Sequence, residues 1–190
     1  MAKAKKNVSG QTGLSYTQQI KWDKKEKAFW AKYFSNPPTP EHIPEHCDHL
    51  SFRSSDITDD EIGFVVSRVS SINMLDLDDA YITYKAIEHL TRLEYLKELR
   101  LKGCTELDYR CVPYLVNIKG LELLQLVNTQ ILVKELMNMS SLTSLKKLFI
   151  SETITPELAV EMRRLKKELS GCEFYVNYKL YEEEEERKQI

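Results

Sequence analysis

The sequence predicts an α/β protein, a short solenoid with parallel strands on its concave side and helices on its convex side. A pattern of two apolar residues separated by one residue recurs along the chain. The first residues of successive copies lie 25, 24, 25 and 24 positions apart. The copies are Leu50–Phe52, Leu75–Leu77, Leu99–Leu101, Leu124–Leu126 and Leu148–Ile150, with a weaker sixth at Phe174–Val176. A fixed period of this length is typical of proteins that stack one strand per repeat.

The segments between the strands carry helix signals. Apolar residues recur at every third position before a strand, as in Leu90, Leu93, Leu96 and Leu99. Thr58 is followed by Glu61 in the spacing of a capping box. Thr155 precedes Pro156, and proline suits the first position of a helix. We therefore expect helices between the strands, on the convex side.

The repeat unit resembles the leucine-rich-repeat family. The residues that carry the resemblance are clearest in Leu99–Asp108 and Leu50–Asp59, and the form is closest to the cysteine-containing type of repeat. The family places a short polar residue after each strand, and the corresponding residues here are Ser55, Ala80, Cys104, Thr129 and Thr153. The resemblance covers about residues 47 to 177. It implies a solenoid that binds other proteins, without implying which ones.

The chain divides into four predicted segments. A helix is predicted from Ile20 to Phe34, and its large aromatic residues are spaced so that they can share one side: Trp22, Phe29, Trp30, Tyr33 and Phe34. This helix is expected to cap the first repeat, since terminal repeats need a cover; the alternative is an aromatic and basic patch for a partner. The segments are a mobile tail (1–19), a capping helix with a proline-rich link (20–46), five repeats with a degenerate terminal strand (47–177) and an acidic tail (178–190).

Composition narrows the class of function. The net charge of −2 argues against nucleic acid or a membrane surface as the partner. No apolar run is long enough to span a bilayer. The four cysteines form no close pairs, which favours a reducing compartment, so a cytoplasmic location is expected, with a mitochondrial one as the alternative. The sequence holds no phosphate loop and no pair of nucleophile and base, so neither a cofactor nor an enzymatic activity is expected.

One cluster invites a metal interpretation. His42, His46, Cys47 and His49 are residue types that bind zinc. However, Cys47 lies three positions before Leu50, where the next repeat has Ile72, so it is predicted to point into the core. The sequence therefore predicts no metal site, and a metal-binding protein is kept as the weakest alternative.

The predicted site lies on the concave face of the strands. Because side chains alternate along a strand, the residues beside the core leucines point to this face. We expect Leu123, Val127, Phe149 and Tyr175 to form an apolar patch for a partner, with Asp76, Asp78, Arg100 and Lys102 as its charged rim. Asp76 is expected to pair with Arg100, and Asp78 with Lys102. The alternative is that Tyr178–Tyr181 fold back and cover the patch from within.

These observations predict a non-enzymatic module for protein–protein interaction. A narrower alternative is an assembly or neutralising factor for one specific protein complex, such as a respiratory-complex assembly factor or the immunity partner of a toxin. No residue in the sequence identifies the partner.

Overall fold

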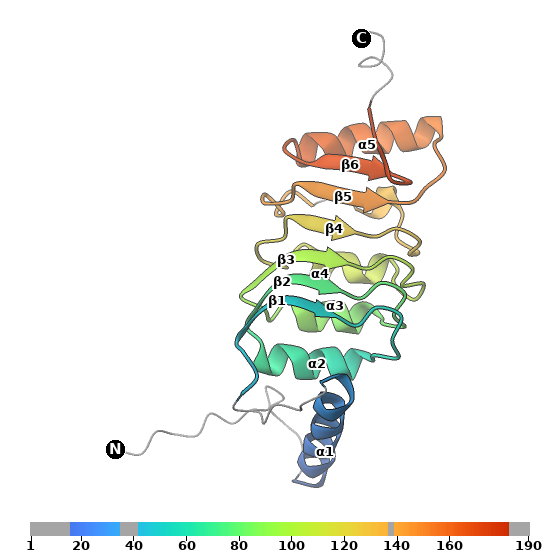
Figure 1. Ribbon diagram of the computed structural model, residues 1–190. Coiled ribbons are helices and arrows are strands. Elements are labelled where there is room, and N and C mark those ends of the chain that lie inside the picture. The colour runs from blue at the N-terminus through green and yellow to red at the C-terminus, as the bar shows by residue number, and fades with distance from the viewer. Residues whose placement is uncertain (1–15, 35–41, 137–138, 183–190) are drawn as a thin grey trace.

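The computed structural model describes residues 16–34, 42–136 and 139–182. These described residues form a mostly parallel sheet of seven strands whose spatial order follows the order of the sequence (Figure 1). Only the last strand runs antiparallel to its neighbour. The strands are β1 (His46–Ser51), β2 (Ser71–Asp76), β3 (Tyr95–Arg100), β4 (Leu123–Gln125), β5 (Lys147–Ile150), β6 (Glu173–Val176) and β7 (Lys179–Leu180).

Helices and parallel strands alternate, which confirms the predicted α/β class. The helices are α1 (Tyr16–Tyr33), α2 (Asp59–Arg68), α3 (Tyr84–Leu90), α4 (Val112–Leu115) and α5 (Pro156–Glu168), and the short 3₁₀ helices are Tyr109–Cys111 and Val133–Glu135. Helices α2 to α5 lie along one face of the sheet, and α1 lies beyond α2 at the β1 end (Figure 1). We call the opposite face of the sheet the open face.

The register of the strands follows the sequence repeat. Leu75 pairs with Leu99, and Leu99 pairs with Leu124, so the sequence period equals the length of chain between paired positions. The leucines at this position in β2 to β5 are 0% exposed. Leu50 is only half-buried because β1 is the first strand of the sheet. The core therefore lies between the strands and helices α2 to α5.

The predicted helix starts are confirmed at both ends of the sheet. Thr58 accepts a hydrogen bond from the N–H of Glu61, whose carboxylate accepts one from the N–H of Thr58. Thr155 caps α5 through the N–H of Leu158, and Pro156 is the first residue of that helix. These caps satisfy backbone groups that a helix cannot pair internally.

The loops after the strands share one backbone conformation. Ser54, Asp79, Gly103 and Asn128 have φ of 51°, 59°, 73° and 58°. Each loop hydrogen-bonds to the next, as when the N–H of Gly103 donates to the carbonyl of Val127 at 2.8 Å. Glycine suits Gly103 best because a Cβ there would also collide with the carboxylate of Asp79.

The small residues after the strands satisfy carbonyl groups in the loops. The hydroxyls of Ser55 and Thr129 donate to the carbonyls of Phe52 and Leu126, three residues earlier. Ala80 has no such donor. Instead, the thiol of Cys104 in the next repeat donates to the carbonyl of Leu77 at 3.1 Å. The cysteine therefore supplies the hydrogen bond that the alanine lacks.

Helix α1 is anchored on the first strand–helix unit. Phe29 and Trp30 are buried, and the Phe29 ring lies 5.8 Å from that of Phe64 in α2. Glu26 accepts from Nε of Arg68 at 2.7 Å and from the indole of Trp30 at 3.3 Å. This helix thus covers the apolar end of the core.

The predicted tail boundaries need correction at both ends. Helix α1 begins at Tyr16 and not at residue 20, consistent with the helix-forming glutamines there. At the other end, β7 pairs with β6, and the N–H of Tyr181 donates to the carbonyl of Phe174 at 2.8 Å. Residues 178–182 therefore belong to the fold. The remaining parts of both predicted tails (1–15 and 183–190) and residues 35–41 of the proline-rich link lie outside the described residues.

Candidate protein-binding face

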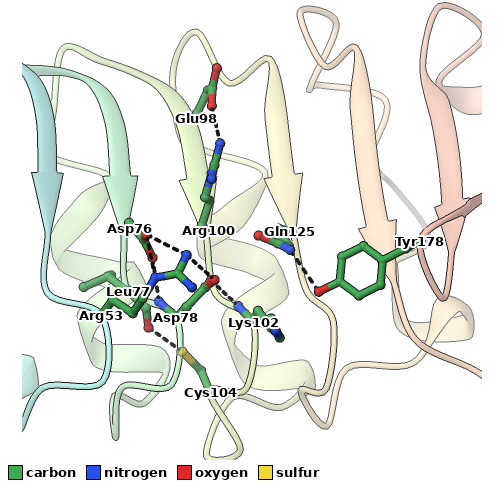
Figure 2. Close-up of polar contacts among 10 residues, drawn as sticks. All are labelled: Arg53, Asp76, Leu77, Asp78, Glu98, Arg100, Lys102, Cys104, Gln125 and Tyr178. Carbon is green, nitrogen blue, oxygen red and sulfur yellow. Dashed lines mark hydrogen bonds and ion pairs between the residues drawn. The ribbon is translucent and has the colours of Figure 1, made fainter.

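One row of side chains runs across the open face, with one residue from each of the strands β2 to β6. Asp76 pairs in register with Arg100, Arg100 with Gln125, Gln125 with Phe149, and Phe149 with Tyr175. The row therefore changes from acidic at β2 to basic at β3, polar at β4 and aromatic at β5 and β6. Figure 2 shows the acidic, basic and polar part of this face together with Tyr178.

The two carboxylates at the acidic end are buried under Arg53. Nη2 of Arg53 lies 2.9 Å from Oδ2 of both Asp76 and Asp78, and its Nε donates to Asp76 at 3.1 Å. Asp76 also accepts from the N–H of Asp78 at 3.1 Å, and Asp78 accepts from the N–H of Lys102 at 2.9 Å (Figure 2). The cluster joins the loops of three successive repeats.

The expected ion pairs across β2 and β3 are therefore wrong. The register brings Asp76 beside Arg100, but Arg53 reaches the carboxylate from the opposite side. Asp78 bonds to the backbone of Lys102 and not to its ammonium group. Because both aspartates are buried, they cannot serve as a charged rim for a partner.

Electrostatics in this cluster fit a structural role. Burial raises the pKa of the Asp78 carboxyl, although the N–H of Lys102 opposes the shift. Hydrogen bonding to Asp76 and the nearby charge of Asp78 raise the pKa of Arg53, which stays positively charged. The cluster thus holds its charges within the fold.

Two basic side chains come next on this face: Arg100 is the last residue of β3, and Lys102 lies two residues beyond the strand. Nη2 of Arg100 is 3.4 Å from Oε2 of Glu98, and both side chains are about one-third exposed. Among the described residues, no carboxylate forms an ion pair with the half-buried Lys102. The ammonium group of Lys102 therefore has no carboxylate partner within the described residues, whereas the guanidinium of Arg100 already has Glu98 as a neighbour.

The aromatic end is formed by a stacked pair. The rings of Phe149 and Tyr175 lie 4.5 Å apart with an interplanar angle of 12°. Leu123, also expected in this patch, is half-buried on β4 and pairs in register with Lys147 and not with Phe149. The hydroxyl of Tyr178 accepts from Nε2 of Gln125 at 3.3 Å, and its ring lies 6.4 Å from that of Phe149. Partial cover by the C-terminal segment is therefore present.

Val127 does not join this patch, and the expectation that it is exposed is wrong. Its side chain is 2% exposed. Strand β4 ends at Gln125, so the alternation that places side chains on opposite faces does not extend to residue 127. Asp78 holds the corresponding place two residues after β2 and is buried as well.

The histidine cluster lies at the start of β1. Cys47 pairs in register with Ile72 and is half-buried against the core, as its repeat position predicted, and burial raises the pKa of its thiol. Within the part of the chain that the structure describes, no three His, Cys, Asp or Glu side chains are grouped closely enough to hold a metal ion.

One polar row in this region has the order of a nucleophile, a base and an acid. Nδ1 of His46 lies 2.8 Å from Oγ of Ser71, and its Nε2 lies 3.4 Å from Oδ1 of Asp48. The N–H groups of Ser70 and Ser71 both donate to the carbonyl of Glu45, so these two groups are not free to stabilise an oxyanion. The side chain of Asp48 is 89% exposed and is screened by water.

Comparison with known proteins gives no family assignment. No model of a protein family matches the chain, and no curated protein matches it. Of the described helices, none has the length and apolar character needed to cross a membrane.

Three side chains of the face make contacts that the sequence does not predict. Strand alternation puts Arg53 and Gln125 on the concave side, but the reach of Arg53 to two carboxylates of the next repeat depends on its rotamer. Tyr178 belongs to the segment that the sequence offered as an alternative cover of the patch. Its turn also has a sequence signal, because Asn177 and Tyr178 form a two-residue connection between two short strands, a spacing typical of a hairpin.

Proposed function

We propose that the chain is a leucine-rich-repeat solenoid that acts as a non-enzymatic binding module. The strand offsets of 24 and 25 residues, the helices along one side and the repeated left-handed loop residues support this architecture. The open face of the sheet is the proposed binding surface, and another protein is the proposed partner.

One observation carries the proposal. A stacked aromatic pair lies two strands from a basic pair, on a face that helices α2 to α5 leave uncovered (Figure 1). Aromatic residues and arginine are the residue types that contribute most to binding energy at protein interfaces. The proposed contact residues are Leu123, Gln125, Phe149, Tyr175, Arg100 and Lys102. Asp76, Asp78 and Val127 are left out because they are buried.

The test is capture of the partner from host extract, followed by matched variants. Phe149→Asp places a charge in the aromatic pair, and Val160→Asp makes the same kind of change at an exposed apolar residue of α5. Lys102→Glu is matched by Lys85→Glu, which makes the same change in charge at an exposed lysine of α3.

We expect a protein recovered by the wild-type chain to be recovered equally by Val160→Asp and Lys85→Glu. Its recovery should fall at least tenfold with Phe149→Asp and Lys102→Glu, provided that both variants melt as cooperatively as the wild type. Equal recovery by all four variants would refute the open face as the binding surface.

A further inference from the structure

Tyr178 has an unusual backbone conformation for its residue type. Asn177 and Tyr178 connect β6 to β7 with φ of 51° and 66°, and Val176 pairs with Lys179 across the turn. A two-residue turn with both residues at positive φ favours asparagine followed by glycine. Asparagine occupies the first place here, but a bulky aromatic residue occupies the second, where it is a conformational outlier.

This conformation places the Tyr178 side chain across the open face. The hydroxyl group reaches Gln125 on β4, and the ring lies at a tilted 47° to Phe149 on β5 (Figure 2). The residue is nevertheless 51% exposed. Tyr178 therefore occupies the aromatic end of the proposed site without being held there by burial.

The basic end of the site has no comparable occupant among the described residues. Arg100 lies on β3, two strands away from Phe149 on β5. Neighbouring strands are about 4.8 Å apart, so the two positions are separated by about 10 Å. An extended peptide advances about 3.3 Å per residue, so about three residues would span this distance.

We infer that Tyr178 is a displaceable occupant and that the partner presents an extended acidic segment with an aromatic residue. This inference rests on the proposed function. The partner's aromatic ring takes the place of Tyr178 against Phe149 and Gln125. Carboxylates about three residues away pair with Lys102, which has no carboxylate partner among the described residues, and with Arg100, whose contact with Glu98 is long at 3.4 Å. The segment lies across the strands and not along them.

Two variants separate the ring of Tyr178 from its hydroxyl group. Tyr178→Gly provides the residue that the turn favours and removes the ring from the open face. Tyr178→Phe keeps the ring and removes only the hydrogen bond to Gln125. If the ring competes with a ligand, the glycine variant should bind the ligand more tightly, and the phenylalanine variant should change binding little.

The probe is a fluorescent peptide, Gly-Gly-Tyr-Gly-Gly-Glu-Glu-Gly, with its binding to the full chain measured by anisotropy. The comparison peptides replace both glutamates by lysine, or the tyrosine by alanine. We expect the acidic aromatic peptide to bind best, Lys102→Glu to weaken it at least tenfold and Lys85→Glu to leave it unchanged. Tyr178→Gly should tighten binding about fivefold or more.

Three results would overturn the inference. The lysine peptide could bind as well as the glutamate peptide, which would remove charge recognition. Tyr178→Gly could weaken binding or leave it unchanged, which would make Tyr178 part of the surface or irrelevant to it. A full-length variant with glutamine at positions 182 to 186 could bind the peptide more than tenfold more tightly than the wild type. That result would mean that the chain's own glutamates, and not a partner, pair with Arg100 and Lys102.

The inference and the proposed function can fail separately. If the captured partner depends on Phe149 and Lys102 but the acidic peptide does not bind, the open face remains the binding surface and the inferred partner chemistry is wrong. If the partner's recovery is also insensitive to Phe149→Asp and Lys102→Glu, both are wrong.

Discussion

The buried carboxylate of Asp78 provides a sharp test of how the loops are held together. It accepts a hydrogen bond from the N–H of Lys102 at 2.9 Å and forms an ion pair with the guanidinium of Arg53, also at 2.9 Å. Asp78→Ala removes the hydrogen bond and the ion pair, whereas Asp78→Asn keeps an oxygen that can accept from the N–H of Lys102. The two variants therefore separate the loss of a carboxylate charge from the loss of an acceptor.

The magnitude follows from these two contacts. An N–H group left without a partner costs about 1–3 kcal/mol, and a hydrogen bond to a charged group contributes about 1.5–3 kcal/mol. Part of this loss is offset because the variant no longer buries a charge. We expect Asp78→Ala to lower the free energy of unfolding by about 2–4 kcal/mol and Asp78→Asn by about 1 kcal/mol.

The assay is urea unfolding monitored by circular dichroism, with thermal unfolding as a second readout. For a chain of this size, the loss expected for Asp78→Ala lowers the melting temperature by about 5–12 °C. A loss below about 0.5 kcal/mol for Asp78→Ala would refute the argument, because surface substitutions fall in that range.

The pH dependence of the same variants gives an independent check. Burial raises the pKa of Asp78 above its ordinary value of 3.8, so the folded chain binds this proton at a higher pH than the unfolded chain. As the pH falls through the raised pKa towards 3.8, this group shifts the equilibrium towards the folded state. The difference in unfolding free energy by which Asp78→Asn falls short of the wild type should therefore grow as the pH is lowered.

Three further predictions concern the rest of the fold. Glu26→Ala removes the buried ion pair between α1 and α2, and should lower the free energy of unfolding by about 3 kcal/mol and make α1 susceptible to limited proteolysis. The control is Lys25→Ala, which removes an exposed pair with Asp60 and should lower the free energy of unfolding by under about 0.5 kcal/mol. Burial and nearby Arg92 lower the pKa of His89 from its ordinary 6.5. The contribution of His89 to stability is therefore present above pH 6.5 and is lost as the pH falls from there towards the lowered pKa. His89→Gln should flatten that part of the plot of unfolding free energy against pH, measured by chemical unfolding. Gly103→Ala forces a side chain into a left-handed position against Asp79 and should cost about 1–3 kcal/mol, whereas Gly171→Ala meets open space and should be nearly neutral in the same assay.

Repetition made the fold class predictable from the sequence. A single Leu-x-Leu motif is weak evidence for a strand, but copies at offsets of 24 and 25 residues fix which positions pair. The structure has Leu75 opposite Leu99 and Leu99 opposite Leu124, as that spacing requires. The helix starts at Thr58 and Thr155 were equally visible, because capping depends on residues only three positions apart.

The surface chemistry was less predictable because it depends on side-chain reach. Register placed Asp76 beside Arg100, but a flexible guanidinium from the preceding repeat reached the carboxylate instead. Alternation within strands did not apply to Val127, which lies past the end of β4. The position of the Tyr178 ring depends on a left-handed backbone that local propensity disfavours for tyrosine.

The central proposal is that a protein partner occupies the open face. Its most direct test is an NMR map of backbone amide shifts in the isotope-labelled chain on addition of the captured partner. The proposal predicts the largest changes at Arg100, Gln125 and Phe149, on three neighbouring strands. Changes confined to the helical side, around Tyr84 and Val160, would contradict it.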